Sequence, residues 1–255
     1  MDINIYKIEK KKYKGSNLAL MLLFFIVLNL GLIGTLIFSR EFQSTMNFTG
    51  YSWLNIMDSY FMYKVILNPI LLSVLVSKSV DMENQGNMWK YLKSCGVDFK
   101  KIYKVKFQYI FRLYFIYQCL EWLMIIILSK SIGLRETMPI YRMSIYFVKQ
   151  LSISYLLMAI HYLAAIKWEN QLVTISISLI GTVVGVISMF LPIVFSNLVP
   201  YSWYVTMISL QYNYVARNEY YISIRDVNYF PLLIAVVLGT VFYKLGEKYF
   251  KEAEG

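Results

Sequence analysis

The stretch that decides the fold runs from Asn17 to Phe38 and reads NLALMLLFFIVLNLGLIGTLIF. It contains no charged residue. As a helix it is long enough to cross the roughly 30 Å hydrocarbon core of a bilayer, which needs about 20 apolar residues. A cleaved signal peptide would have a shorter apolar core and a small-residue cleavage site, and neither is visible. We therefore interpret residues 17–38 as a first membrane-spanning helix.

The rest of the chain repeats this alternation of charge clusters and apolar stretches. Of its 255 residues, 58% are hydrophobic and only 16% are charged, which is too little charge for the surface of a soluble domain of this length. The sequence predicts one all-α integral membrane domain over residues 1–255, with five further spans at 59–77, 107–129, 143–166, 171–192 and 227–243. The basic segment 1–16 is predicted to form an amphipathic helix at the membrane surface.

The number of spans depends on the uncharged run from Asn170 to Ala216, which is too long for one helix. With six spans, the most basic segments share one side: residues 1–16, 78–106 and 244–251. The positive-inside rule assigns that side to the cytoplasm, and a seventh span would put the lysine-rich C-terminal segment outside. Residues 193–216 are therefore predicted to form an outer re-entrant or interfacial hairpin, with both termini in the cytoplasm.

Enzyme and cofactor signatures are missing from the sequence. It has no G-x-x-x-x-G-K-[ST] phosphate loop, no G-x-S-x-G motif, and a single histidine, His161, outside any metal-binding pattern. The net charge of +10 accompanies no nucleic-acid recognition motif and fits cytoplasmic loops that face anionic headgroups. We therefore expect that this chain is not an enzyme, that it binds no metal or cofactor, and that it has no nucleic-acid partner.

The loop 78–106 between the second and third spans is the most specific feature. Within it Met88, Leu92 and Cys95 share one face of a short helix, and Asp98 is placed to cap a second helix that leads into the third span. A short amphipathic helix at this place can dock into a groove on a partner protein. It would equally suit a position on lipid headgroups, and the residues alone leave both interpretations open.

The same loop resembles that of the permeases of type-2 ABC exporters. The residues that carry the resemblance are Glu83, Gly86, Trp89, Lys90 and Leu92, followed by a turn and by Lys100-Lys101-Ile102 entering a span. The resemblance implies a cytoplasmic coupling helix whose contacts with a separate ATPase subunit come from Glu83, Gly86, Met88, Trp89, Lys90 and Leu92. Family members often have a proline in the turn after this helix, where this chain has Ser94-Cys95-Gly96.

The small size, the lysine-rich start and the Tyr- and Ile-rich composition resemble permeases that protect bacteria against lantibiotics. The resemblance implies an exporter in the bacterial cell membrane, with ATP and Mg²⁺ bound by an ATPase dimer. It also implies a second permease, identical or homologous, and an amphipathic peptide as substrate in contact with membrane lipid. The alternatives are a proton-coupled carrier that uses Glu121, and a non-transporting assembly or sensor subunit.

Charged groups inside the spans are functional candidates because they are costly in a bilayer. Glu121 lies near the middle of the third span, where we expect it to pair with a basic group as a structural or subunit contact. Lys64, Lys149 and Arg112 lie near span ends and are expected to snorkel to the headgroups. His161, close to the inner end of the fourth span, is expected at the interface.

Aromatic residues are concentrated in the uncharged segment 193–216. Tyrosine and tryptophan gather at membrane interfaces as an anchoring belt, and this interpretation is favoured here. The sharper hypothesis is an outer vestibule for an amphipathic peptide, lined by Trp203, Tyr204 and Tyr212.

Overall fold

The computed structural model describes residues 2–13, 15–84, 98–168, 170–216 and 219–254, and within them it is dominated by helices. These are α1 (Asp2–Tyr13), α2 (Leu18–Ile37), α3 (Arg40–Thr45), α4 (Ser52–Asn84), α6 (Phe99–Ser131), α7 (Ile140–Lys167), α8 (Gln171–Ser188), α9 (Ile193–Leu198) and α10 (Phe230–Glu254). In this described part, six helices are long and apolar enough to cross a membrane: α2, α4, α6, α7, α8 and α10. The predicted all-α membrane protein with six spans is confirmed.

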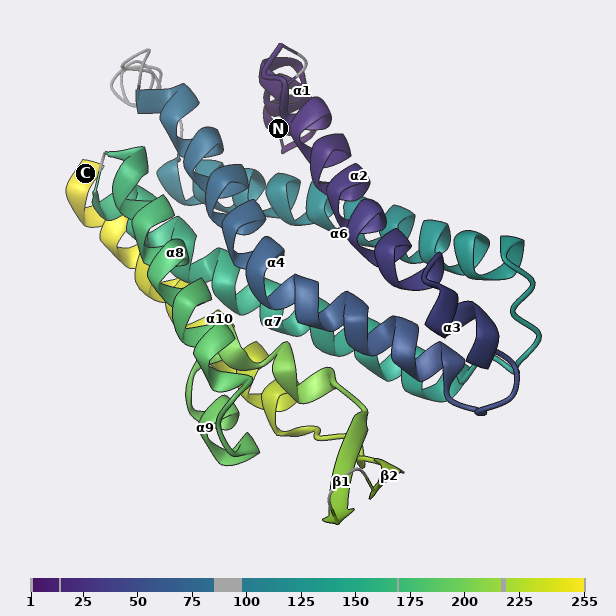
Figure 1. The fold of residues 1–255 in the computed structure, drawn as a ribbon. Coiled ribbons are helices and arrows are strands. Elements are labelled where there is room, and N and C mark those ends of the chain that lie inside the picture. The colour runs from purple at the N-terminus through teal and green to yellow at the C-terminus, as the bar shows by residue number, and fades with distance from the viewer. Residues whose placement is uncertain (1, 14, 85–97, 169, 217–218, 255) are drawn as a thin grey trace.

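Two helices form the centre of the bundle. α4 packs against α2, α7 and α8, and α7 packs against α4, α8 and α10 (Figure 1). Along α4 and α7 most side chains are buried in the protein, whereas α2 and α10 turn most of theirs outward. The polar residues of α4 and α7 therefore lie in the interior, where each needs a partner from a neighbouring helix.

The long helices extend beyond the spans that hydropathy alone predicts. α4 begins at Ser52 rather than at residue 59, because Glu136 of the α6–α7 loop accepts hydrogen bonds from the backbone nitrogens of Gly50 (3.0 Å) and Ser52 (2.8 Å). At the start of α6 the Asp98 carboxylate accepts a hydrogen bond from the backbone nitrogen of Lys100, which confirms the predicted cap. Pro69 lies inside α4 without ending it.

One end of the bundle collects the basic segments. The tight turn from α1 into α2 is made at Asn17, whose φ of 53° lies in the left-handed region that asparagine tolerates. α1, the last turn of α4, the first turn of α6 and the last turn of α10 gather at this end, and α3 lies at the other (Figure 1). The N-terminal segment, the two helix ends that flank the loop 78–106, and the C-terminal segment therefore lie at the same end, as an even number of spans requires.

The segment that follows α8 contains a β-hairpin that was not predicted from the sequence. After α9 come two short 3-10 helices (Pro200–Ser202 and Val205–Met207), and then β1 (Leu210–Ala216) pairs antiparallel with β2 (Glu219–Ile224). Within the predicted outer hairpin, residues 193–216, lie α9, the two 3-10 helices and β1, whereas β2 follows that range. Asp58 of α4 fixes the start of β1, because its carboxylate accepts hydrogen bonds from the backbone nitrogens of Ser209 and Leu210, both at 2.7 Å.

Small residues let this segment approach α8 closely. A side-chain carbon at Gly181 would overlap the ring of Tyr201, whereas one at Gly31 of α2 would meet nothing within 4 Å. We expect Gly181→Leu to lower the free energy of unfolding by about 1–3 kcal/mol through overpacking. Gly31→Leu should leave it unchanged or raise it slightly through helix propensity. Thermal unfolding of the detergent-purified protein measures both, and equal effects would show that the contact at Gly181 is loose.

Candidate functional site

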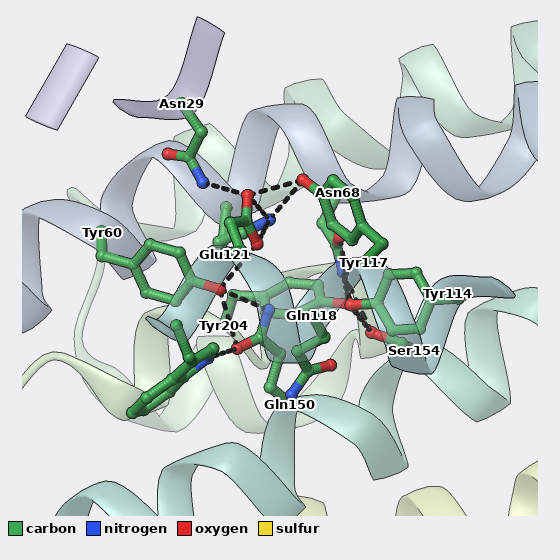
Figure 2. Close-up of polar contacts among 12 residues, drawn as sticks. Asn29, Tyr60, Asn68, Tyr114, Tyr117, Gln118, Glu121, Gln150, Ser154 and Tyr204 are labelled. Carbon is green, nitrogen blue, oxygen red and sulfur yellow. Dashed lines mark hydrogen bonds and ion pairs between the residues drawn. The ribbon is translucent and has the colours of Figure 1, made fainter. Parts of the chain in front are cut away.

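The first candidate site surrounds Glu121 in the middle of α6. Its carboxylate pairs with the ammonium of Lys64 from α4, with Lys64 Nζ 2.6 Å from Oε2 and 2.7 Å from Oε1. Both side chains are completely buried. Two further groups donate to Oε1 at 2.6 Å, the Tyr117 hydroxyl and Asn29 Nδ2, and the Tyr60 hydroxyl donates to Oε2 at 3.0 Å (Figure 2). The carboxylate is therefore neutralised and saturated with donors.

Helix periodicity explains how these groups converge. Tyr60, Lys64 and Asn68 follow one another at intervals of four on α4, and Tyr117 and Glu121 are four apart on α6. Each set therefore lies on one face of its helix, and the two faces meet in the bundle centre (Figure 2). An unpaired charge buried in the middle of a membrane-spanning helix would cost a large desolvation free energy, but the ion pair and the hydrogen bonds of Glu121 offset that cost.

The polar network continues to α7 and to the segment that follows α9. Gln150 of α7 accepts a hydrogen bond from Trp122 Nε1 at 3.0 Å, and its amide donates to the Tyr60 hydroxyl at 2.8 Å. One turn further along α4, Asn68 Nδ2 lies within hydrogen-bonding distance of the hydroxyls of Tyr114, Ser154 and Tyr204, at 3.0, 3.0 and 2.6 Å (Figure 2). These hydrogen bonds link α2, α4, α6, α7 and the segment after α9, and so fix the positions of these elements relative to one another.

The second candidate site lies at the basic end of the bundle, between α1, α4 and α6. Lys106 of α6 is completely buried, with Nζ 3.0 Å from Glu83 Oε1 and 3.3 Å from Glu9 Oε2. Lys12 joins the same two carboxylates, at 2.7 Å from Glu83 and 3.3 Å from Glu9. Two lysines and two glutamates therefore balance each other, and we call these four residues the inner charge network.

Two further contacts fix this network to α4. Lys106 Nζ donates to the backbone oxygen of Ser79 at 3.1 Å, and the hydroxyls of Tyr13 and Ser79 are hydrogen-bonded to each other. Burial raises the pKa of the Tyr13 hydroxyl well above its usual value, so this group stays protonated at neutral pH. Glu83 lies at the end of α4 where the chain enters the predicted coupling loop, so the network joins α1 to the root of that loop.

Of the predicted coupling residues, Glu83 is the one that lies within the described part of the chain. It is completely buried and forms part of the inner charge network. Gly86, Met88, Trp89, Lys90 and Leu92 lie outside the described residues.

The expected snorkelling of Lys64 and Lys149 is wrong. Both are completely buried, because α4 and α7 are the central helices of the bundle. Glu121 was expected to pair with an unspecified basic group, and that group is Lys64. Lys149 Nζ donates to the backbone oxygen of Thr206 at 3.1 Å. The interfacial position expected for His161 is also wrong, since its ring is buried with Nε2 3.5 Å from the Tyr201 hydroxyl. Arg112 is exposed on α6, as expected.

The three aromatic residues considered for an outer vestibule do not lie together on one open surface. Trp203 and Tyr204 are 2% and 0% exposed, and Tyr204 belongs to the network around Asn68. Tyr212 on β1 is 49% exposed. In this conformation Trp203 and Tyr204 are packed inside the protein, and Tyr212 is accessible.

Several members of the two networks were not singled out from the sequence: Asn29, Tyr60, Asn68, Gln150, Glu9, Lys12 and Lys106. For α4 a signal existed, because Tyr60, Lys64 and Asn68 make a polar stripe at intervals of four inside an apolar span. For the inner charge network the residues come from distant segments, and the sequence carries no sign that they meet.

Six apolar helices around a buried polar interior define a multi-pass integral membrane protein. Residues 5–185 match the family model described as ABC-2 family transporter protein. The match covers well over half of the chain, so the protein belongs to the ABC-2 transporter family. It is accordingly the permease subunit of an ABC transporter, a membrane component that works with an ABC ATPase and is not itself the catalytic enzyme. No curated protein and no solved structure matches the chain.

Proposed function

We propose that this permease expels a lantibiotic or a similar amphipathic peptide antibiotic from the bacterial cell membrane for self-protection. ATP and Mg²⁺ bind a dimer of the partner ATPase on the cytoplasmic side, where both termini of the permease also lie. A second permease, identical or homologous, completes the transport pathway, because six spans are half of a typical exporter pathway.

The observation that carries this proposal is the inner charge network at the root of the coupling loop. Glu83 and Lys106 lie on the two helices that flank the loop, and their ion pair of 3.0 Å ties those helices together. Glu9 and Lys12 add α1 to the same unit. A push from the ATPase on the loop would then move the ends of α4 and α6 as one piece, with α1 attached.

The lipid-facing side of the bundle supports a substrate that is dissolved in the membrane. A groove of about 700 Å³ lies between α2 and α6 and is almost entirely apolar, with Val27 and Leu30 on one wall and Met124 and Ile127 on the other. It reaches Phe38 and Ser131, the ends of α2 and α6 farthest from the inner charge network. An amphipathic peptide in the outer half of the bilayer would meet this surface first.

Co-purification combined with resistance tests the proposal. The permease is expressed together with a candidate partner ABC ATPase in a lantibiotic-sensitive strain, and the lantibiotic concentration that stops growth is measured. We expect the ATPase to co-purify, and Trp89→Ala with Leu92→Ala to lower resistance about tenfold or more through lost coupling contacts. The matched control is Gln85→Ala with Lys93→Ala, two changes in the same loop outside the expected contact set.

Three results would contradict the proposal. Resistance that is unchanged in the Trp89 and Leu92 variant would show that coupling does not use these residues. Activity that survives ATP depletion but collapses with the proton gradient would identify the proton-coupled carrier instead. Binding to other membrane proteins without any effect on substrate levels would identify an assembly or sensor subunit.

A further inference from the structure

A cavity of about 560 Å³ opens between α1, the first turns of α2 and the first half of α6. One side carries three lysines of α1, Lys7, Lys10 and Lys11, and the opposite side is apolar, with Leu18, Ala19 and Leu22 of α2. The cavity thus combines concentrated positive charge with an apolar wall.

The three lysines have no acidic partner among the residues that the structure describes, and all three are exposed. Lys12, on the same helix, points inward and is satisfied by Glu9 and Glu83. Lys7 lies three and four residues from Lys10 and Lys11, so the like charges share one helical face and repel one another. An anion bound between them would relieve this repulsion.

Aromatic rings pack against one another behind the cavity. The rings of Tyr13 and Tyr109 stack with centroids 4.5 Å apart, and the Tyr6 ring lies 5.6 Å from that of Tyr109. The guanidinium of Arg112 lies over the Tyr6 ring at 5.1 Å and adds another cation beside the cavity. Tyr13 and Tyr109, two residues of the cavity lining, are therefore positioned by their stacking contact.

The apolar wall extends into the membrane. Ala19 is exposed, and below it the outward face of α2 continues with Leu20, Leu23, Phe24 and Val27, which are 56–69% exposed. The lysines lie where this span begins, the depth at which phosphate groups of a bilayer are found. A small soluble anion would satisfy the lysines but would leave the apolar wall uncovered.

We propose that this cavity binds one anionic phospholipid. Its phosphate lies among Lys7, Lys10 and Lys11, and an acyl chain runs along α2 over Ala19 and Leu22. Because the lipid contacts the outer side of α1 and Lys12 contacts the inner side, bound lipid holds α1 against α2 and α6. The site would bind lipid whether or not the chain transports a peptide.

Native mass spectrometry of the delipidated full-length protein tests the site. Phosphatidylglycerol and phosphatidylcholine with identical acyl chains are titrated in parallel. We expect one molecule of phosphatidylglycerol to bind with a preference of about tenfold or more, through the three lysines. The combined change Lys7→Gln, Lys10→Gln and Lys11→Gln should abolish that preference. Ala19→Trp, which fills the cavity but keeps every charge, should weaken the binding of phosphatidylglycerol itself.

The matched control removes three exposed lysines from the same end of the bundle but away from the cavity, by Lys104→Gln, Lys244→Gln and Lys251→Gln. It should keep the preference, and an equal loss in this control would overturn the proposal in favour of general charge attraction. Equal binding of the two lipids would also overturn it. So would displacement of the lipid by millimolar glycerol phosphate, because recognition would then not include the acyl chain.

Discussion

Lys64→Met is expected to lower the free energy of unfolding by about 3–5 kcal/mol, because it leaves the buried Glu121 carboxylate without its cation. Glu121 would retain its hydrogen bonds from Tyr117, Asn29 and Tyr60. Those dipoles stabilise a negative charge less than an ammonium at 2.6 Å does. The change would be measured as the midpoint of thermal or detergent-induced unfolding of the purified protein.

A double variant separates the ion pair from simple loss of packing. Glu121→Gln added to Lys64→Met removes the stranded charge and keeps a side chain that accepts hydrogen bonds, so it should recover at least about half of the lost stability. Arg112→Met is the matched control, since it removes an exposed cation from α6 and should cost under about 1 kcal/mol. If the double variant is as unstable as the sum of the two single changes, Lys64 and Glu121 do not act as a pair.

Lys106→Met is expected to loosen α1 from the bundle. The change leaves Glu9 and Glu83 with one shared cation, Lys12, whose side chain is 23% exposed, and should weaken the attachment of α1 by about 3 kcal/mol. Hydrogen exchange followed by mass spectrometry would show faster exchange of the α1 amides, by at least about tenfold, while the amides of α7 keep their protection.

Two variants control this measurement. Lys104→Met removes an exposed lysine from the same helix and should leave the exchange of α1 unchanged. Lys106→Arg keeps the positive charge and should restore much of the protection. Exchange in Lys106→Met that matches Lys104→Met would mean that α1 is held by its apolar and aromatic contacts, and that the inner charge network contributes little.

Most of the fold was predictable because membrane thickness fixes the length of an apolar helix. The six spans could be predicted from apolar stretches with few or no charged residues, and the even number of spans required by the basic ends decided how to divide the uncharged run that begins at Asn170. The helix ends were less predictable, since α4 is capped by Glu136, a residue more than eighty positions away. The pairing of β1 with β2 was not predicted, because the aromatic residues of this segment are equally typical of an anchoring belt at the membrane interface.

The candidate site was predictable only in part. A mid-span carboxylate must have a partner, and that argument pointed correctly to an ion pair at Glu121. It did not identify the partner, because Lys64 and Lys149 both lie in spans and only the packing of α4 against α6 distinguishes them. The inner charge network joins α1, α4 and α6. A single sequence does not indicate which residues of two helices face each other, so these ion pairs could not be predicted.

The polar stripe of α4 has a mechanical consequence. Tyr60, Lys64 and Asn68 together bond to α6, to α7 and to Tyr204, so rotating α4 about its axis would break all of these contacts together. α4, α6 and α7 are therefore expected to move as a rigid body during a transport cycle. A movement of α2 along α6 would slide over the apolar groove between them and, among the polar contacts described above, would break the hydrogen bond from Asn29 to Glu121.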